Sequence, residues 1–138
     1  MKDLHHILDI RRAISPDEGA GDNVAKVSQI IDRQGFESLE FAIATGTVAD
    51  AGATFTVLVE HADEVGFNVT NEAVADKYLL GTEALASFDQ DDDDSVFTIG
   101  YIGPKRFVRL TITPAGNAGA WDIAALAILG HANDVPVS

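Results

Sequence analysis

Short runs of alternating hydrophobic and polar residues dominate the chain and predict β-strands. In the run from 38 to 45, Leu39, Phe41 and Ile43 fall on one face, because side chains alternate between the two faces of a strand. The run from 121 to 129 is more continuously apolar and fits either a buried strand or a short helix. The turn-forming residues before it and Gly130 after it favour a strand, with Trp121 buried at its start. The expected strands are 7–15, 27–33, 38–45, 54–61, 95–102, 106–113 and 121–129.

Turn-forming residues separate these runs at short intervals, as in all-β folds. The pattern predicts a single-domain antiparallel β-sandwich over 1–138, jelly-roll-like, with seven to eight strands. The segment 70–80 departs from the alternation, since Asn71 can cap a helix and Gly81 can end one. We therefore expect at most one short helix, near 71–80. The first strand is expected to end in a turn at Ser15-Pro16.

Composition narrows the function. The chain has 138 residues, of which 46% are hydrophobic, and this is enough for one domain with its own core. The absence of cysteine excludes disulfides, thiolate nucleophiles and iron–sulfur sites. Nine basic against 22 acidic residues give a formal charge of −13, which argues against nucleic acid and against an anionic membrane as partners. No apolar run is long enough to span a membrane, and the N-terminal residues do not form a signal peptide.

The acidic residues gather in one part of the chain. Residues 60–94 hold 11 of them against a single basic residue, Lys77, and we expect this region to face solvent. The run FDQDDDDS begins at Phe88, and Asp89, Asp91 and Asp93 have the spacing of the first EF-hand ligands. Asp94 stands where that loop needs glycine, and Gly100 stands where it needs a carboxylate. The run predicts a solvated loop, with a weak cation site as the alternative.

No other pattern indicates chemistry. The four histidines lack the spacing that places two ligands on one helix face, and His61 is expected to face a loop beside Asp63. His5 and His6 are consecutive and suit a surface. There is no nucleophile elbow and no phosphate-binding glycine loop. The sequence therefore predicts no catalytic, cofactor-binding or resident metal site, no cofactor and no enzymatic activity.

Five segments resemble a known family. They read RAISP at 12–16, IIDRQGFESLEFAIATGTVADAGATFTVLVEHAD at 30–63, LLGTEA at 79–84, IGYIGPKRFVRLTITP at 99–114 and AILGHANDVPV at 127–137. They resemble small acidic structural or hypothetical proteins of tailed bacteriophages and prophages that are encoded among head genes. The resemblance covers more than half of the chain and brings no active site. It implies a virion structural protein, on the capsid surface, made in the cytoplasm of the host bacterium.

Within that resemblance, a capsid decoration or cement protein is the expectation that we favour. Its partners would be the major capsid protein and further copies of itself, as a dimer or trimer. Residues 1–12 are a candidate docking arm, the alternative being an ordinary first strand in the chain's own sheet. Residues 132–138 would form a short C-terminal tail. The candidate capsid contacts are Leu4, Ile7, Leu8, Ile10, Arg11, Arg12, Lys105 and Arg106.

Two alternatives remain from the sequence. A head–tail connector, tail component or vertex spike base would differ from a decoration protein in its copy number. A carbohydrate-binding module belongs to a different class and would need exposed aromatic rings, for which Trp121, Tyr78 and Tyr101 are the candidates.

Overall fold

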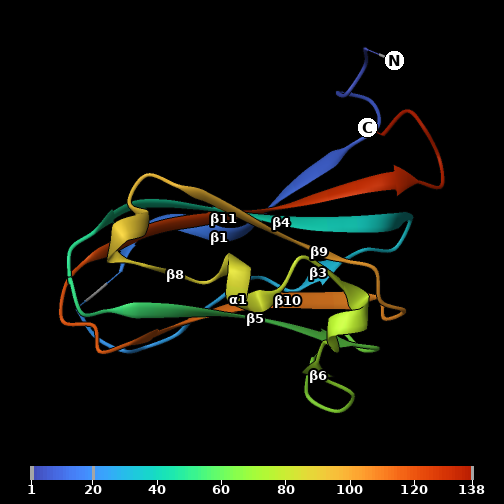
Figure 1. Ribbon diagram of the computed structural model, residues 1–138. Helices are drawn as coiled ribbons and strands as arrows, with labels where there is room; N and C mark the ends of the chain where they lie inside the picture. Colours follow the sequence, from blue (N-terminus) through green and yellow to red (C-terminus); the bar gives the residue numbers. More distant parts are fainter. Residues whose placement is uncertain (1, 20, 138) are drawn as a thin grey trace.

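The computed structural model describes residues 2–19 and 21–137. These residues form two antiparallel sheets that pack face to face (Figure 1). The long strands are β1 (Asp9–Gly19), β4 (Phe36–Val48), β5 (Thr54–Ala62), β9 (Val96–Tyr101), β10 (Phe107–Ala115) and β11 (Trp121–Ala132). The short strands are β2 (Lys26–Val27), β3 (Ile31–Asp32), β6 (Glu72–Ala73), β7 (Leu79–Leu80) and β8 (Phe88–Asp89). Helix α1 (Glu83–Ala86) and two 3₁₀ turns, η1 (Asp76–Tyr78) and η2 (Gln90–Asp92), complete the chain.

The strand order is that of a jelly roll. The first sheet runs β1-β11-β4-β9-β7, and the second runs β2-β10-β5-β6, with β3 also pairing with β10 and β8 with β5. From β4 onward the long strands alternate between the sheets: β4, β9 and β11 lie in the first and β5 and β10 in the second. β1 also lies in the first sheet, and the short strands β2 and β3 that follow it lie in the second. This crossing pattern of two Greek keys defines the jelly roll. The predicted all-β, single-domain antiparallel sandwich is confirmed.

Inward-facing residues of both sheets fill the space between them, as the alternation predicts. Trp121 is 1% exposed, which agrees with the expectation that it is buried. The Phe55 ring lies between two other rings, with centroid distances of 4.9 Å to Phe88 and 4.7 Å to Trp121. These contacts join the two sheets at one end of the core. Among the described residues, no helix is long and apolar enough to cross a membrane.

The helix expected near 71–80 is present only as the 3₁₀ turn η1. Val74 donates its backbone N–H to Val59 of β5, so this segment makes sheet-edge hydrogen bonds in place of helical ones. The α-helix lies just downstream, where the Thr82 side chain accepts a hydrogen bond from the N–H of Leu85. The sequence signal for this helix is Thr82 itself, a capping residue that lies beyond the segment 70–80.

Two expected strand boundaries also differ. The first strand does not end in a turn at Ser15-Pro16; β1 continues to Gly19 through irregularities in its pairing with β11 on either side of Ile14. A bulge tolerates the missing N–H of proline better than a regular ladder does. The strand expected at 27–33 is divided into β2 and β3, because the Ser28 side chain accepts a hydrogen bond from the N–H of Leu110.

Candidate docking surface

The outer faces of the two sheets differ in polarity. On the second sheet, the outward residues of β5 and β10 form cross-strand pairs that are mostly polar, such as Thr56 with Thr113 and Glu60 with Arg109. On the first sheet, the outward residues are mostly apolar and include Leu126, which is 46% exposed, and Val96, which is 68% exposed. Exposed apolar side chains that cluster on one face indicate an interaction surface.

The register of the first sheet arranges these side chains in rows, because directly paired residues share a face. We call this surface the open face. Its rows are Ile10–Ile128–Glu40–Gly100–Leu80, then Arg12–Leu126–Ala42–Thr98, then Ala124–Ala44–Val96. The alanines keep the centre of the open face flat, and leucine, isoleucine and valine side chains stand around them.

The open face carries two charged side chains, Arg12 and Glu40. The Glu40 carboxylate lies over Gly100. A Cβ atom added at Gly100 would come within 2.8 Å of the Glu40 carboxylate. Glu40 is half-buried and has no hydrogen bond or ion pair with the described residues, and this burial raises the pKa of its carboxyl. Arg12 is exposed and likewise has no partner among the described residues. Both groups are therefore available to a molecule that covers the face.

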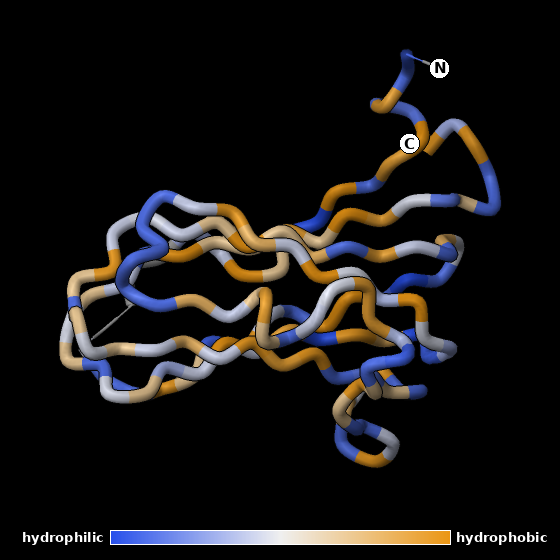
Figure 2. Tube along the Cα trace, in the orientation of Figure 1, coloured by the Kyte–Doolittle hydropathy of each residue, from blue (hydrophilic) through white to orange (hydrophobic). Residues whose placement is uncertain are grey.

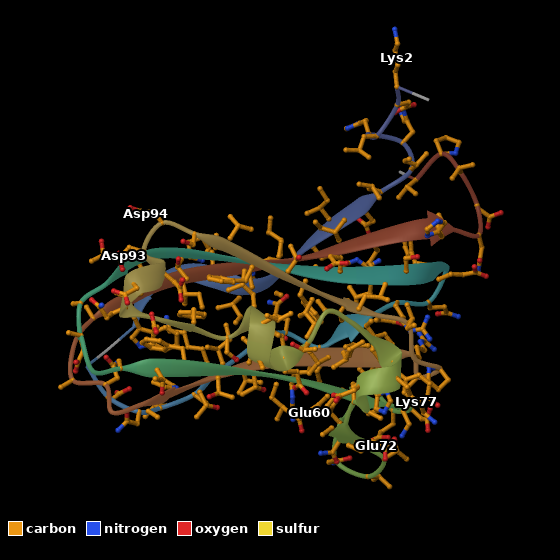
Figure 3. The ribbon with its side chains drawn as sticks, viewed as in Figure 1. Lys2, Glu60, Glu72, Lys77, Asp93 and Asp94 are labelled. Atoms are coloured by element: carbon orange, nitrogen blue, oxygen red, sulfur yellow. The ribbon has the colours of Figure 1, made fainter. Side chains whose placement is uncertain are left out.

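The structure divides the predicted docking arm into two parts, a projecting segment before residue 9 and a part of strand β1 from residue 9 onward. Residues 9–12 pair with β11, as Asp9 with Leu129 and Arg12 with Leu126, so they belong to the chain's own sheet. Residues 2–8 project beyond the sandwich, beside the C-terminal segment (Figure 1). The N–H of Val137 donates to the carbonyl of His6 at 2.7 Å and joins the two ends of the chain. Figure 2 shows hydrophobic and hydrophilic positions interleaved along the projecting segment, and Figure 3 shows Lys2 at its far end.

An apolar groove of about 720 Å³ lies between the projecting segment and the open face. Ile7 and Leu8 line it from the arm, and Ile102 and Val135 line it from the body and the C-terminal segment. Leu4 is 64% exposed and forms a smaller apolar hollow with Leu8 and Ile10. The structure thus brings together the four predicted apolar contacts, Leu4, Ile7, Leu8 and Ile10.

Three of the four predicted basic contacts already have partners in the chain. Arg11 binds Asp9 at 2.8 Å and the Asp32 carbonyl at 2.6 Å. Arg106 makes two hydrogen bonds to the Asp32 carboxylate, at 2.7 and 2.8 Å, and thereby lowers the pKa of that carboxyl. Lys105 binds Glu72 at 3.1 Å. Their positive charge is offset locally, and Arg12 is the predicted basic contact that the described residues leave without a partner.

The acidic run forms a capped turn at the end of the sandwich (Figure 3). The Asp89 side chain accepts a hydrogen bond from the N–H of Asp91, and the Asp93 side chain accepts one from the N–H of Val48. The carboxylates of Asp89, Asp91 and Asp93 do not converge on one point, and the described residues contain no group of three or more potential metal ligands. Asp91 and Asp93 are exposed, as a solvated loop requires.

The expectation that His61 faces a loop is wrong. His61 is 2% exposed, and its Nδ1 lies 2.7 Å from the Tyr101 hydroxyl while its Nε2 lies 3.0 Å from a Glu72 carboxylate oxygen. The signal was in the alternation, because His61 follows Phe55, Val57 and Val59 in phase on the inward face of β5. Since the His61 ring is enclosed, its contact with Tyr101 supports the end of the sandwich.

Comparison with known proteins identifies the fold and no family. No family model matches the chain, and no curated protein matches it. The chain is similar to infectious bursal disease virus VP2 in a subviral particle, with 16% identity over 94% of this chain and a TM-score of 0.57. A structure of the Gx strain of the same virus gives 13% identity over 94% and a TM-score of 0.52. The chain spans about a third of the length of each, 33% and 34%. At these identities the likeness is one of fold.

Proposed function

We propose that this protein is a virion structural protein, and that it acts as a decoration or cement protein on the outer surface of a tailed-phage capsid. The observation that carries the proposal is the arm with its groove, an uncovered apolar surface built from both ends of the chain. The similarity of fold to VP2 of a subviral particle agrees with a virion role.

In the proposed mode of binding, the major capsid protein occupies the groove between the arm and the body. Ile7 and Leu8 would contact it from one side, and Ile102 and Val135 from the other. Burial of this apolar surface supplies the binding energy of each copy. Many copies on one shell then combine weak contacts into a large stabilisation of the particle.

Removal of the arm tests this mode. We expect a variant lacking residues 2–8 to lose binding to shells assembled from the major capsid protein alone, as measured by co-sedimentation. The sandwich should persist, because β1 begins at Asp9 and keeps its pairs with β11. The control replaces Lys2 with glutamate at the exposed tip and should bind like the wild type. Undiminished binding of the truncated protein would overturn the assignment of the arm.

The alternatives retain different support. A connector, tail or vertex spike-base protein could use the same groove and would differ in the number of copies on a particle. The carbohydrate-binding alternative loses its three candidate residues, since Trp121 and Tyr101 are each 1% exposed and Tyr78 is half-buried. No phenylalanine, tyrosine or tryptophan of the described chain is exposed enough to form a platform for a sugar ring.

A further inference from the structure

The open face carries opposite charges at two separate positions. Arg12 pairs with Leu126 across β1 and β11, and Glu40 pairs with Ile128 across β4 and β11. The two charged residues therefore lie diagonally across β11, about 12 Å apart for the usual strand spacing and rise. The structure shows no ion pair between them, and the area between them is apolar.

We propose that a second copy of this chain packs on the open face, so that Arg12 of each copy pairs with Glu40 of the other. A two-fold axis in the plane of the interface, passing over β11 between Leu126 and Ile128, exchanges the positions of the two charges. Such an interface is isologous, so one contact between unlike residues occurs twice. Leu126 and Ile128 then meet their own counterparts at the centre, and the alanines permit close approach.

Charge complementarity within the face favours a second copy over another occupant. The molecule as a whole has a formal charge of −13, which opposes self-association at random surfaces. The open face offers an apolar centre with one positive and one negative group, and it is complementary to itself. Burial without a partner raises the pKa of Glu40 in the single chain, and a guanidinium in contact would offset this effect.

The size of the open face sets the expected affinity. Four strands and three rows of residues cover about 20 Å by 20 Å. This is below the area of a standard stable interface, so we expect a dimer that dissociates in the micromolar range. The proposal concerns the isolated protein. Glu40, Leu80 and Ile128 of the open face also line the groove, so a dimer packed on the open face and a capsid bound in the groove would compete for these three residues.

Sedimentation velocity on charge-reversed variants tests the proposal. The wild type should shift from monomer to dimer between about 1 and 500 µM. Arg12→Glu and Glu40→Arg should each weaken dimerisation at least tenfold, because each places like charges together. The double variant should recover dimerisation to within about threefold of the wild type. Lys2→Glu makes the same charge change as Arg12→Glu away from the face, and it should leave the dimer unchanged.

A pair of apolar variants provides a test that does not depend on the charged residues. Leu126→Asp should abolish the dimer, whereas Leu58→Asp, on the outer face of the second sheet, should not. Circular dichroism establishes that each variant is folded. A wild type that stays monomeric, a trimer, a dimer that Leu126→Asp does not disturb, or a double variant that fails to recover would each overturn the proposal.

Discussion

His61 and Tyr101 form the polar centre of one end of the core. The Tyr101 hydroxyl hydrogen bonds with His61 and accepts the backbone N–H of Lys105 at 3.0 Å, so it links β5 to the connection between β9 and β10. Tyr101 is 1% exposed, so the partners of its hydroxyl lie within the protein. A buried polar group without a hydrogen-bond partner destabilises the fold by more than a formed hydrogen bond stabilises it. We therefore expect this network to contribute to the free energy of unfolding.

Removal of the Tyr101 hydroxyl tests its contribution. Tyr101→Phe leaves the Lys105 N–H and the His61 ring nitrogen without this partner, and we expect a loss of about 1–3 kcal/mol in the free energy of unfolding. Tyr78→Phe is the matched control, because the hydroxyl of Tyr78 has no hydrogen bond to the described residues, and it should change stability by less than about 0.5 kcal/mol. Urea unfolding followed by tryptophan fluorescence measures both. Equal effects would show that the network is not stabilising.

For single residues, the hydrophobic–polar alternation of the sequence correctly predicted which side chains are buried, but it did not predict which polar side chains pair with one another. It placed Trp121, Phe41 and Ile43 in the core, where they are. The same alternation put His61 on an inward face, but its polarity suggested a loop. Ion pairs such as Arg106 with Asp32 join residues 74 positions apart, and no local pattern specifies them. Of the predicted basic contacts, Arg11, Lys105 and Arg106 pair with acidic side chains of the same chain, and Arg12 has no partner among the described residues.

Among the elements, the segment after β5 closes an edge of the second sheet. β6 and β8 pair with the two ends of β5, and helix α1 covers the part between them. There the N–H of Val59 donates to the Glu83 carboxylate at 2.8 Å, and the N–H of Val57 donates to the Ser87 hydroxyl at 3.0 Å. Side chains thus satisfy a strand edge that would otherwise be open to other strands.

Substitution of Glu83 separates hydrogen bonding from charge at this edge. Glu83→Ala should cost about 1–2 kcal/mol, because it leaves the Val59 N–H without its acceptor. Glu83→Gln keeps an acceptor and removes the charge. Since burial raises the pKa of Glu83, the ionised side chain is disfavoured there, and the glutamine variant should match or exceed the wild type at pH 7. Urea unfolding would contradict this interpretation if both variants lost the same stability.

The connection between β5 and β6 is held by one carboxylate. Glu64 accepts backbone hydrogen bonds from Asn68, Val69 and Thr70, as well as the Thr70 hydroxyl, and these bonds lower its pKa to about 2. A lowered carboxyl pKa means that the stabilisation is complete above pH 4.5 and is lost as the pH falls from there through about 2.

Amide resonances report this carboxylate directly. The N–H signals of Asn68, Val69 and Thr70 should titrate with a midpoint near pH 2. Glu64→Gln should abolish that titration and increase hydrogen exchange at the same three amides at pH 6. Glu37→Gln, which changes an exposed residue outside this connection, should leave both unchanged. A midpoint near pH 4.5 in the wild type would contradict the hydrogen bonds to the loop.

At the scale of elements, the sequence located all of the long strands, but of the short ones only β2 and β3, which it merged into the single run 27–33. Long strands contain several repeats of the hydrophobic–polar alternation, whereas the two-residue strands are too short to show a repeat. The helix near 71–80 was misplaced because Asn71 and Gly81 resemble helix ends and Val74 and Tyr78 fit a helical spacing. In the structure Val74 hydrogen bonds to the edge of β5 instead. Contacts between distant segments decided that region.

For the whole molecule, the proposed function depends on surfaces that no single strand specifies. The sequence predicted a sandwich, an apolar arm and a polarised charge, all of which depend on local composition. The open face arises from the order β1-β11-β4-β9, which places side chains from four separated segments on one surface. The groove likewise requires both ends of the chain, and only the folded structure brings them together.

The central claim is that many copies of this protein cover a capsid shell, and its copy number tests that claim most directly. The measurement is quantitative mass spectrometry of purified particles, with the major capsid protein as the reference. We predict a ratio of this protein to the major capsid protein between about one to one and one to a few, because many weak contacts must add up over the whole shell. About a dozen copies or fewer per particle would favour the connector or spike-base alternative. Complete absence from particles would contradict a virion role.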